Sequence, residues 1–280
     1  SGIRLAVVDG LGELVAEAAG PYPEAFANPV GWRSGLIDLC RQLPGRVRGA
    51  IGALAIDGTS GTLLLCRPNG DLVGGGLDLA LPYSQACPEH KDHACALAGA
   101  NSPAASASGS LARALRLLTS AEDMGLAGPW LLRHQADWLM GWLLGDWRWG
   151  EEGNNLRLGW DLQAQCWGGS IPSQPWSSAL PEICPSGRRI GQITLTSAEA
   201  LGLSPTCQVI AGSTDANAGV LAASPGAGDG IAVLGTTLVL KQFSPRPIQG
   251  PGISCHRVAG QWLVGGASNG GAGILRRFFS

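Results

Sequence analysis

Short apolar runs divided by glycine-rich turns dominate the hydrophobic pattern of the chain, and most of these runs are too short for helices. Residues 3–8 are apolar, include β-branched side chains and end at an Asp-Gly turn, which predicts a strand followed by a second strand from Glu13. Residues 47–56 predict a buried strand that ends at Asp57. A hairpin formed by residues 62–66 and 72–76 is expected to follow, across a Pro-Asn-Gly turn.

Helical spacing of apolar residues appears first at residues 32–43 and again at residues 111–119, where Ser108 or Ser110 would cap the helix. Residues 77–109, rich in Ala and Ser, are expected to be loop-like. Glycines that fall largely in short turns between apolar runs are typical of a sheet-rich domain with many tight connections.

Tryptophans gather at residues 128–149, which hold five of the ten in the chain. Trp130, Gln135, Trp138 and Trp142 recur at intervals of three to five, which predicts a helix with a broad apolar face. A Trp-rich face of this kind belongs to a core more often than to a sugar-binding platform. His134 is interpreted as a helix residue with its hydrogen bonds satisfied, rather than as a catalyst.

The second half of the chain begins with an irregular, polar stretch, residues 151–190, and then returns to short strands. Residues 208–212 predict a strand that leads into Ser213-Thr214-Asp215. Residues 229–240 predict a strand, a turn and a strand, and residues 262–264 predict a strand running into a glycine loop that opens a helix.

Composition narrows the class of protein. The chain has 280 residues, of which 45% are hydrophobic and 14% charged, and its net charge is −2. This is enough for a sizeable core and offers no basic surface for nucleic acid or an anionic membrane. No apolar run approaches the roughly 18 residues of a transmembrane helix. We therefore expect neither nucleic acid nor membrane as a partner, and the oligomeric state stays open.

The eight cysteines are scattered through the chain, mostly in apolar or Ala-rich surroundings. This predicts free thiols in a reducing compartment, hence a cytoplasmic protein. Cys87, His90, His93 and Cys95 fall close together and could hold zinc. The competing interpretation is a solvated loop before a helix, since the spacing fits no common zinc knuckle.

A tight loop of glycine with threonine or serine between two apolar runs occurs more than once. It stands at residues 58–61 and 235–237, and Ser1-Gly2 fits the end of a third copy. Glycine lets the backbone approach a ligand, while hydroxyls and loop N–H groups can face phosphate or sugar oxygens. A plain hairpin turn is the alternative for each copy.

Asp215 follows a short strand and precedes a run of small residues that starts a helix. Its carboxylate could cap that helix or act as general base for a sugar hydroxyl, and the pattern favours neither.

Three other enzyme motifs are absent or incomplete in the sequence. There is no phosphate loop of the form G-x-x-x-x-G-K-[ST], and Gly10-Leu11-Gly12 lacks the third glycine of a dinucleotide site. Residues 266–270 match G-x-S-x-G, but the later Asp and His of that enzyme class are missing from residues 271–280.

In aggregate the chain resembles the FGGY carbohydrate kinases of the actin-like, ribonuclease-H-like ATPase superfamily, and most closely the pentulose kinases of cyanobacteria and plastids. The likeness covers nearly the whole chain. The segments that carry it are DGTSGTLLLCRPNGDLV, SASGSLARALRL, HQADWLMGWLLG, NNLRLGWD, AGSTDANAGVLA, LGTTLVLK and WLVGGASNGG.

This resemblance implies an α/β, actin-like fold of two domains, with a sugar-binding domain at 1–226 and the beginning of an ATP domain at 227–280. ATP and Mg²⁺ would be the cofactors and a small sugar the partner. Asp215 would be the catalytic base, a sugar contact and a metal ligand. The other implied contacts are Ser1, Thr59 and Ser60 for the sugar, Gly235, Thr236 and Thr237 for the ATP phosphates, and Gly265 and Gly266, which would begin a further loop on the nucleotide side.

The chain also departs from the family. An Asp-x-Gly-Thr precedes Ser-Gly in the family's first loop, and here the chain starts at Ser1. The family continues well beyond the equivalent of Ser280, and its Trp-x-Asp-x-Arg sugar segment is replaced by Tyr83, Ser84 and Gln85. We therefore expect a sugar kinase for D-ribulose, with D-xylulose as the alternative, and a 280-residue piece with little or no turnover. A non-catalytic sugar-binding domain is the hypothesis from another class.

Overall fold

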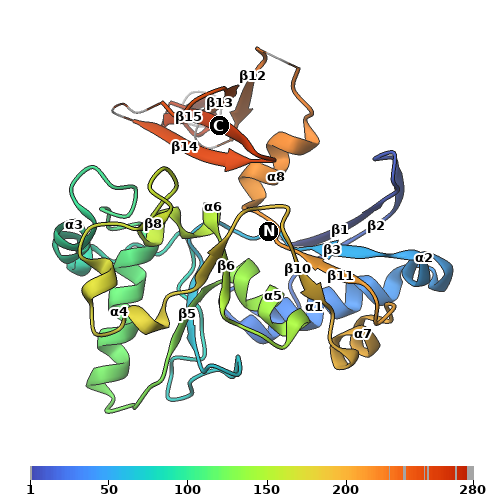
Figure 1. Cartoon of the computed structure of the whole chain (residues 1–280), viewed down its shortest axis with the longest axis horizontal. Helices are drawn as coiled ribbons and strands as arrows, with labels where there is room; N and C mark the ends of the chain where they lie inside the picture. The colour runs from blue at the N-terminus through green and yellow to red at the C-terminus, as the bar shows by residue number, and fades with distance from the viewer. Residues whose placement is uncertain are drawn as a thin grey trace.

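The computed structural model describes residues 2–226, 228–235, 238–248, 250, 252–268 and 270–275. Most of the chain forms an α/β body, and a separate sheet stands on it near the C-terminal end (Figure 1). The body contains the elements β1 (Ile3–Val8), β2 (Leu14–Gly20), α1 (Pro29–Gln42), α2 (Gly45–Ala50), β3 (Ala53–Ala55), β4 (Leu63–Cys66), α3 (Lys91–Ala98), α4 (Ser110–Asp123), β5 (Leu131–His134), α5 (Gln135–Leu144), β6 (Trp149–Glu151), α6 (Glu152–Asn155), β7 (Trp160–Asp161), β8 (Cys166–Trp167), β9 (Glu182–Cys184), β10 (Arg189–Gln192), α7 (Leu195–Leu201), β11 (Gln208–Ile210) and α8 (Asp215–Ala222).

The pairing of β3 with β11 is the feature of the body that builds the site. The two strands run parallel, and β10 adds antiparallel on the far edge of β11. Their carboxyl ends therefore lie at one edge of this sheet, where ligands are usually bound in α/β folds. The chain continues from β3 into the loop that starts at Asp57 and from β11 into the loop that leads to Asp215.

Helices α1 and α5 pack near this sheet because their apolar faces match its buried side. Helix α1 begins at Pro29, where the Asn28 side chain accepts a hydrogen bond from the Val30 N–H at 3.0 Å. Leu36 and Cys40 of α1 share one buried cluster with Val209 of β11. A second cluster, built around α4, β4 and β5, holds the other side of the body.

The C-terminal sheet consists of four antiparallel strands in the order β12-β13-β15-β14. It is joined to the body through α8, and Val220 of that helix packs against Val258 and Leu263 of the sheet. Figure 1 shows this sheet, in orange and red, above the body. Its elements are β12 (Gly230–Leu234), β13 (Leu238–Ser244), β14 (Ile253–Val258) and β15 (Gln261–Ser268), followed by α9 (Ala272–Leu275).

Several predicted elements are confirmed, namely the strands at the start of the chain, the helices at α1 and α4, and the strands at β11, β12, β13 and β15. Others are wrong. Residues 47–56 do not form one strand, because α2 occupies Gly45–Ala50 and only Ala53–Ala55 are extended. Strand β4 pairs with β5 rather than with residues 72–76, which contribute a single bridge between Cys66 and Leu72.

The tryptophan-rich stretch is also divided differently from the prediction. Residues Leu131–His134 form β5, and the helix begins only at Gln135, so Trp130 lies outside it. A strand forms there instead of a helix because β5 pairs with β4 along its whole length. Residues 77–109 are not wholly loop-like, since they include α3. No helix within the described ranges is both long and apolar enough to span a membrane.

Candidate functional site

The loops after β3 and β11 are joined to each other by backbone hydrogen bonds. Gly58 N–H donates to the Ser213 carbonyl at 3.1 Å, and Asp215 N–H donates to the Gly58 carbonyl at 2.9 Å. Gly58 packs against Ala136, and a side chain at Gly58 would approach the Ala136 backbone nitrogen to 3.0 Å. The structure therefore brings the predicted Thr59 and Ser60 loop directly beside Asp215.

Asp215 is the first residue of α8, and its side chain is exposed. The cap of this helix is Thr214, whose Oγ1 accepts a hydrogen bond from the Asn217 N–H at 3.2 Å. Asp215 itself accepts only the N–H of the next residue, Ala216, at 2.7 Å within the described contacts. The interpretation of Asp215 as the helix cap is therefore wrong. Its carboxylate stands at the positive end of a helix dipole and remains open to a ligand.

A second carboxylate, Asp57, lies next to Asp215. Its Oδ1 accepts the Ser213 N–H at 2.7 Å, so it braces the loop that precedes α8. The pKa of Asp57 is raised, first by partial desolvation and further by the negative charge of Asp215, although the bond from Ser213 opposes the shift. The sequence offered one signal for this residue, an acidic side chain placed just before the glycine loop.

Gln135 organises the hydroxyl groups of the loop. Its Oε1 accepts hydrogen bonds from the Thr59 backbone N–H at 3.2 Å and from Thr59 Oγ1 at 3.0 Å, and its Nε2 donates to the Tyr22 hydroxyl at 3.4 Å. Thr59 is thus occupied by protein partners. The hydroxyl of Ser60, half-buried beside it, makes no hydrogen bond in the described part of the chain. Of Thr59 and Ser60, both predicted sugar contacts, Ser60 has the freer hydroxyl.

A cavity of about 760 Å³ opens beside this loop, between the β1–β2 hairpin and β3. Its polar lining includes Tyr22, Asp57 and Gln135. The volume falls in the range typical of small-molecule sites. Thr59, Ser60 and Asp215 do not line this cavity.

Arg113 holds the outer side of the same loop. It is fully buried, and its guanidinium donates to the carbonyls of Gly61 at 3.0 Å, Tyr83 at 2.5 Å and Gln85 at 2.9 Å. Burial lowers the pKa of Arg113 to about 10, and the charge of Arg157 adds to the effect. One buried cation therefore fixes the position of residues 83–85 against the glycine loop.

His134 and Glu151 belong to a buried polar cluster behind the site. His134 Nε2 lies 2.9 Å from Ser110 Oγ, and its Nδ1 lies 3.5 Å from Asp137 Oδ2. His134 is the last residue of β5 rather than part of a helix. Glu151 accepts the N–H groups of Gly153 and Asn154, each at 2.8 Å.

Glu151 should make the stability of the protein depend on pH. Burial raises its pKa to about 8, above the ordinary value of 4.5, with smaller contributions from the charges of Asp137 and Glu152. Between these two pH values the folded chain keeps a proton that the unfolded chain has released. Stability should therefore fall as pH rises from about 4.5 to 8 and level off above it, with a slope of up to about 1.4 kcal/mol per pH unit. Urea unfolding of wild type and Glu151→Gln from pH 5 to 9 measures the difference, and parallel pH profiles for the two proteins would contradict the assignment.

Of the predicted nucleotide contacts, those that the structure describes lie in or next to the C-terminal sheet. Gly235 follows β12, while Thr236 and Thr237, like Ser1, are outside the described residues. Gly265 and Gly266 lie inside β15, so the prediction that a loop begins there is wrong. A side chain at Gly265 would collide with the Leu240 carbonyl oxygen, because β13 and β15 pair closely at this position. This contact explains why the residue is a glycine. A nucleotide contact by Gly265 or Gly266 stays a prediction.

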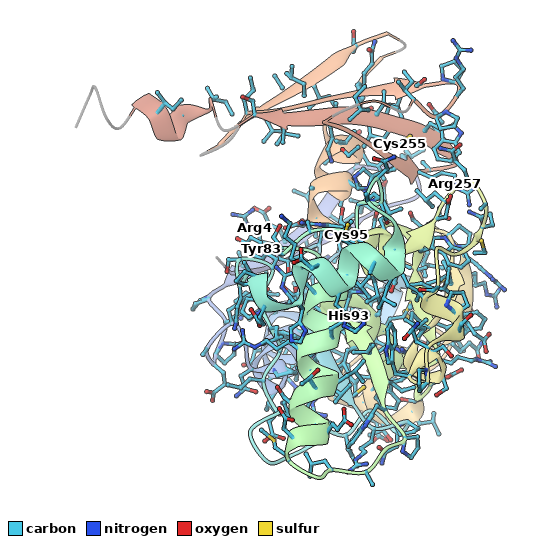
Figure 2. All side chains as sticks on the ribbon, turned by 90° about the vertical axis from the view of Figure 1, so that its left-hand side faces the viewer. Arg4, Tyr83, His93, Cys95, Cys255 and Arg257 are labelled. Atoms are coloured by element: carbon cyan, nitrogen blue, oxygen red, sulfur yellow. The ribbon has the colours of Figure 1, made fainter. Side chains whose placement is uncertain are left out.

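The zinc hypothesis for residues 87–95 is wrong. Within the described residues, no group of three or more His, Cys, Asp or Glu side chains is arranged to hold a metal ion. Cys87 is buried, whereas His93 and Cys95 lie on α3 (Figure 2). The segment is a short 3₁₀ turn at Pro88–His90 and a helix rather than a solvated loop.

Several carbohydrate kinases of known structure are similar to this chain in fold, although no protein-family model matches the chain. Xylulose kinase from Rhodospirillum rubrum superposes with a TM-score of 0.78 at 18% identity, over 99% of this chain and 61% of that one. Gluconate kinase from Lactobacillus acidophilus gives 0.76 at 15% identity, over 99% and 59%. Glycerol kinase from Plasmodium falciparum, solved with ADP, gives 0.74 at 13% identity, over 98% and 60%.

These likenesses show the fold, and the predicted α/β, actin-like ATPase fold is confirmed. The chain spans about three fifths of the length of each of these three structures.

Proposed function

We propose that the chain is the sugar-binding part, with the start of the ATP-binding part, of an ATP-dependent sugar kinase. The observation that carries the proposal is the exposed Asp215 carboxylate, held against the glycine loop of Thr59 and Ser60 by the 2.9 Å bond from Asp215 N–H to Gly58. A general base within reach of a hydroxyl-binding loop is what phosphoryl transfer to a sugar requires. The division into residues 1–226 and 227–280 follows the start of the C-terminal sheet and is part of the proposal.

In the proposed reaction, Asp215 takes the proton of the attacking sugar hydroxyl. The hydroxyl oxygen forms its bond to the γ-phosphorus while the bond from that phosphorus to the bridging oxygen breaks, and ADP leaves with the electron pair. Ser60 orients the sugar, and Gln135 keeps the loop in place through Thr59. Most of the acceleration comes from positioning and from stabilisation of charge.

The exposed carboxylates of Asp215 and Asp57 suit a magnesium ion, and they would hold the ion that accompanies ATP. Mg²⁺ in such enzymes keeps several waters and takes only one or two carboxylates from the protein. The lack of a three-residue acidic cluster in the described part of the chain agrees with this mode of binding. When bound, MgATP supplies the phosphoryl group and neutralises part of its charge, and Gly235, Thr236 and Thr237 would hold the phosphates.

D-ribulose is the proposed substrate and D-xylulose the alternative. The support for a ketopentose is the resemblance of the sequence to pentulose kinases, together with the likeness in fold to xylulose kinases. A sugar-binding domain without catalysis is the candidate from another class. The exposed Asp215 favours the kinase, since a binding module needs no base beside its hydroxyl contacts.

An ADP-release assay tests the proposal. D-ribulose, D-xylulose, L-ribulose, gluconate and glycerol are each offered with MgATP to this chain and to the whole polypeptide that its gene encodes. We expect turnover by the whole polypeptide with a ketopentose, and little or none by the 280-residue chain. No ADP release by the whole polypeptide with any of the five would reject the kinase.

A further inference from the structure

Lys241 connects the C-terminal sheet to the helix that carries Asp215. The chain contains two lysines, and the other, Lys91, is exposed at the start of α3. Lys241 lies on β13, the strand that begins directly after the predicted phosphate loop at 235–237. Its side chain leaves the sheet and reaches the first turn of α8.

Two hydrogen bonds define this contact. Lys241 Nζ donates to the Ala216 carbonyl at 3.2 Å and to Asn217 Oδ1 at 3.1 Å. Asn217 is fully buried and its N–H is bonded to Thr214, the cap of α8. The lysine therefore holds the turn that immediately follows Asp215, in part through the buried side chain of Asn217.

Two titratable groups, Asp215 and His256, lie close enough to Lys241 to interact with its charge. Burial lowers the pKa of Lys241, and the negative charge of Asp215 raises it. His256 of β14 is half-buried, and desolvation together with the charge of Lys241 lowers the pKa of His256 to about 4, so this histidine is neutral at pH 7. No carboxylate in the described part of the chain forms an ion pair with Lys241.

The sheet provides room for this arrangement. Gly265 of β15 pairs with Lys241, and a side chain at Gly265 would approach Lys241 Cγ to 3.0 Å. A glycine at this position thus leaves space for the stem of the lysine as well as for the close pairing of the strands. The remaining described attachments of the sheet to the body are the Val220 cluster and the Arg257–Glu152 pair.

We propose that Lys241 is a positioning residue for phosphoryl transfer, which holds the first turn of α8, and with it Asp215, in place relative to strand β13. The inference rests on the proposed function and goes beyond it, because it assigns a role to a residue outside the predicted sugar and nucleotide contacts. A base that shifts by about 1 Å relative to the phosphates can cost about 100-fold in rate. Lys241 would help to hold that distance, because its two hydrogen bonds join β13 to the turn after Asp215.

The test compares Lys241→Met with Lys241→Arg and with Lys91→Met as the matched control. In the 280-residue chain, hydrogen exchange of the Asn217 and Ala218 amides should become about 10-fold faster or more in Lys241→Met, because bonds to a charged group are lost. Exchange in β13 and β15 should stay unchanged, which shows that the sheet is folded. Lys241→Arg should restore part of the protection, and Lys91→Met should behave as wild type. Lys241→Gln is the milder variant if Lys241→Met does not fold.

Turnover separates this inference from the proposed function. In the whole polypeptide, Lys241→Met should lower kcat by about 10- to 100-fold with little change in the KM for sugar. Unchanged kcat together with unchanged exchange in α8 would overturn the role of Lys241 while leaving the kinase intact. If instead the wild-type polypeptide releases no ADP with any sugar, the proposed function fails, and the exchange experiment still decides whether Lys241 holds α8.

Discussion

Replacement of Asp215 by Asn should abolish sugar phosphorylation by the whole polypeptide, with a loss in kcat of about 1,000-fold or more, while sugar binding persists. A general base contributes about 100- to 10,000-fold to the rate. Asparagine has nearly the same shape and can still bond the Ala216 N–H through its side-chain oxygen. It cannot take the proton of the sugar hydroxyl. The measurements are kcat by ADP release and sugar affinity by calorimetry.

Asp123→Asn is the matched control for this experiment. Asp123 is exposed at the end of α4, and its carboxylate makes no hydrogen bond in the described part of the chain. This variant should keep wild-type kcat and wild-type stability. A normal kcat in Asp215→Asn would remove the general base from the account, and equal losses in both variants would point to a general effect of charge.

Breaking the ion pair between Arg257 and Glu152 should have the second largest effect, on the attachment of the C-terminal sheet. The pair joins β14 to α6 through two parallel hydrogen bonds of 3.0 and 2.8 Å. Figure 2 shows Arg257 on the C-terminal sheet. The Glu152 side chain is 2% exposed, and its bond raises the pKa of Arg257. Arg257→Met leaves a buried carboxylate without a partner, which should cost about 2 kcal/mol, a low value for such pairs because Arg257 itself is 28% exposed.

Trp262 is the only tryptophan after residue 176, and it lies on β15. Its fluorescence can report on this sheet in a reference protein in which the other nine tryptophans are replaced by phenylalanine and which still folds. Urea unfolding followed by its fluorescence should show a lower midpoint for Arg257→Met. The double variant Glu152→Gln with Arg257→Met should recover much of the loss, since the buried charge is removed as well. Additive losses in the double variant would mean that the two side chains do not stabilise the protein as a pair.

The fold class could be predicted from segments that are spread over nearly the whole chain, and the two loops of the candidate site are visible in the sequence through local signals. Asp57 to Ser60 and Ser213 to Asp215 each follow a short apolar run, and strand β11 lies parallel to β3, which brings the two loops together. The prediction for residues 47–56 failed because α2 is a surface helix with no buried residue, so its apolar pattern carries no information on the core. Trp130 was placed on a helix because its spacing matches one, while pairing with β4 decides the structure of the next four residues.

Roles that depend on distant contacts could not be predicted. Gln135 bonds Thr59, which is 76 residues away in the chain, and Arg113 bonds Gly61 across 52 residues. Lys241 lies on β13 of the C-terminal sheet, and its side chain contacts α8. Only the folded chain shows that two of its hydrogen bonds end on the turn after Asp215. Each of these residues looks unremarkable in the sequence, since a glutamine at a helix start, a buried arginine and a strand lysine all have common structural roles.

Calorimetric titration of the 280-residue chain with D-ribulose tests the central claim most directly, because it needs no turnover. The account predicts one site per chain and an affinity about 10-fold weaker in Ser60→Ala, since one hydrogen bond from the hydroxyl is lost. Ser173→Ala, which changes an exposed serine of the body, should bind as wild type. The absence of binding for both D-ribulose and D-xylulose, or an affinity that does not change in Ser60→Ala, would contradict the account.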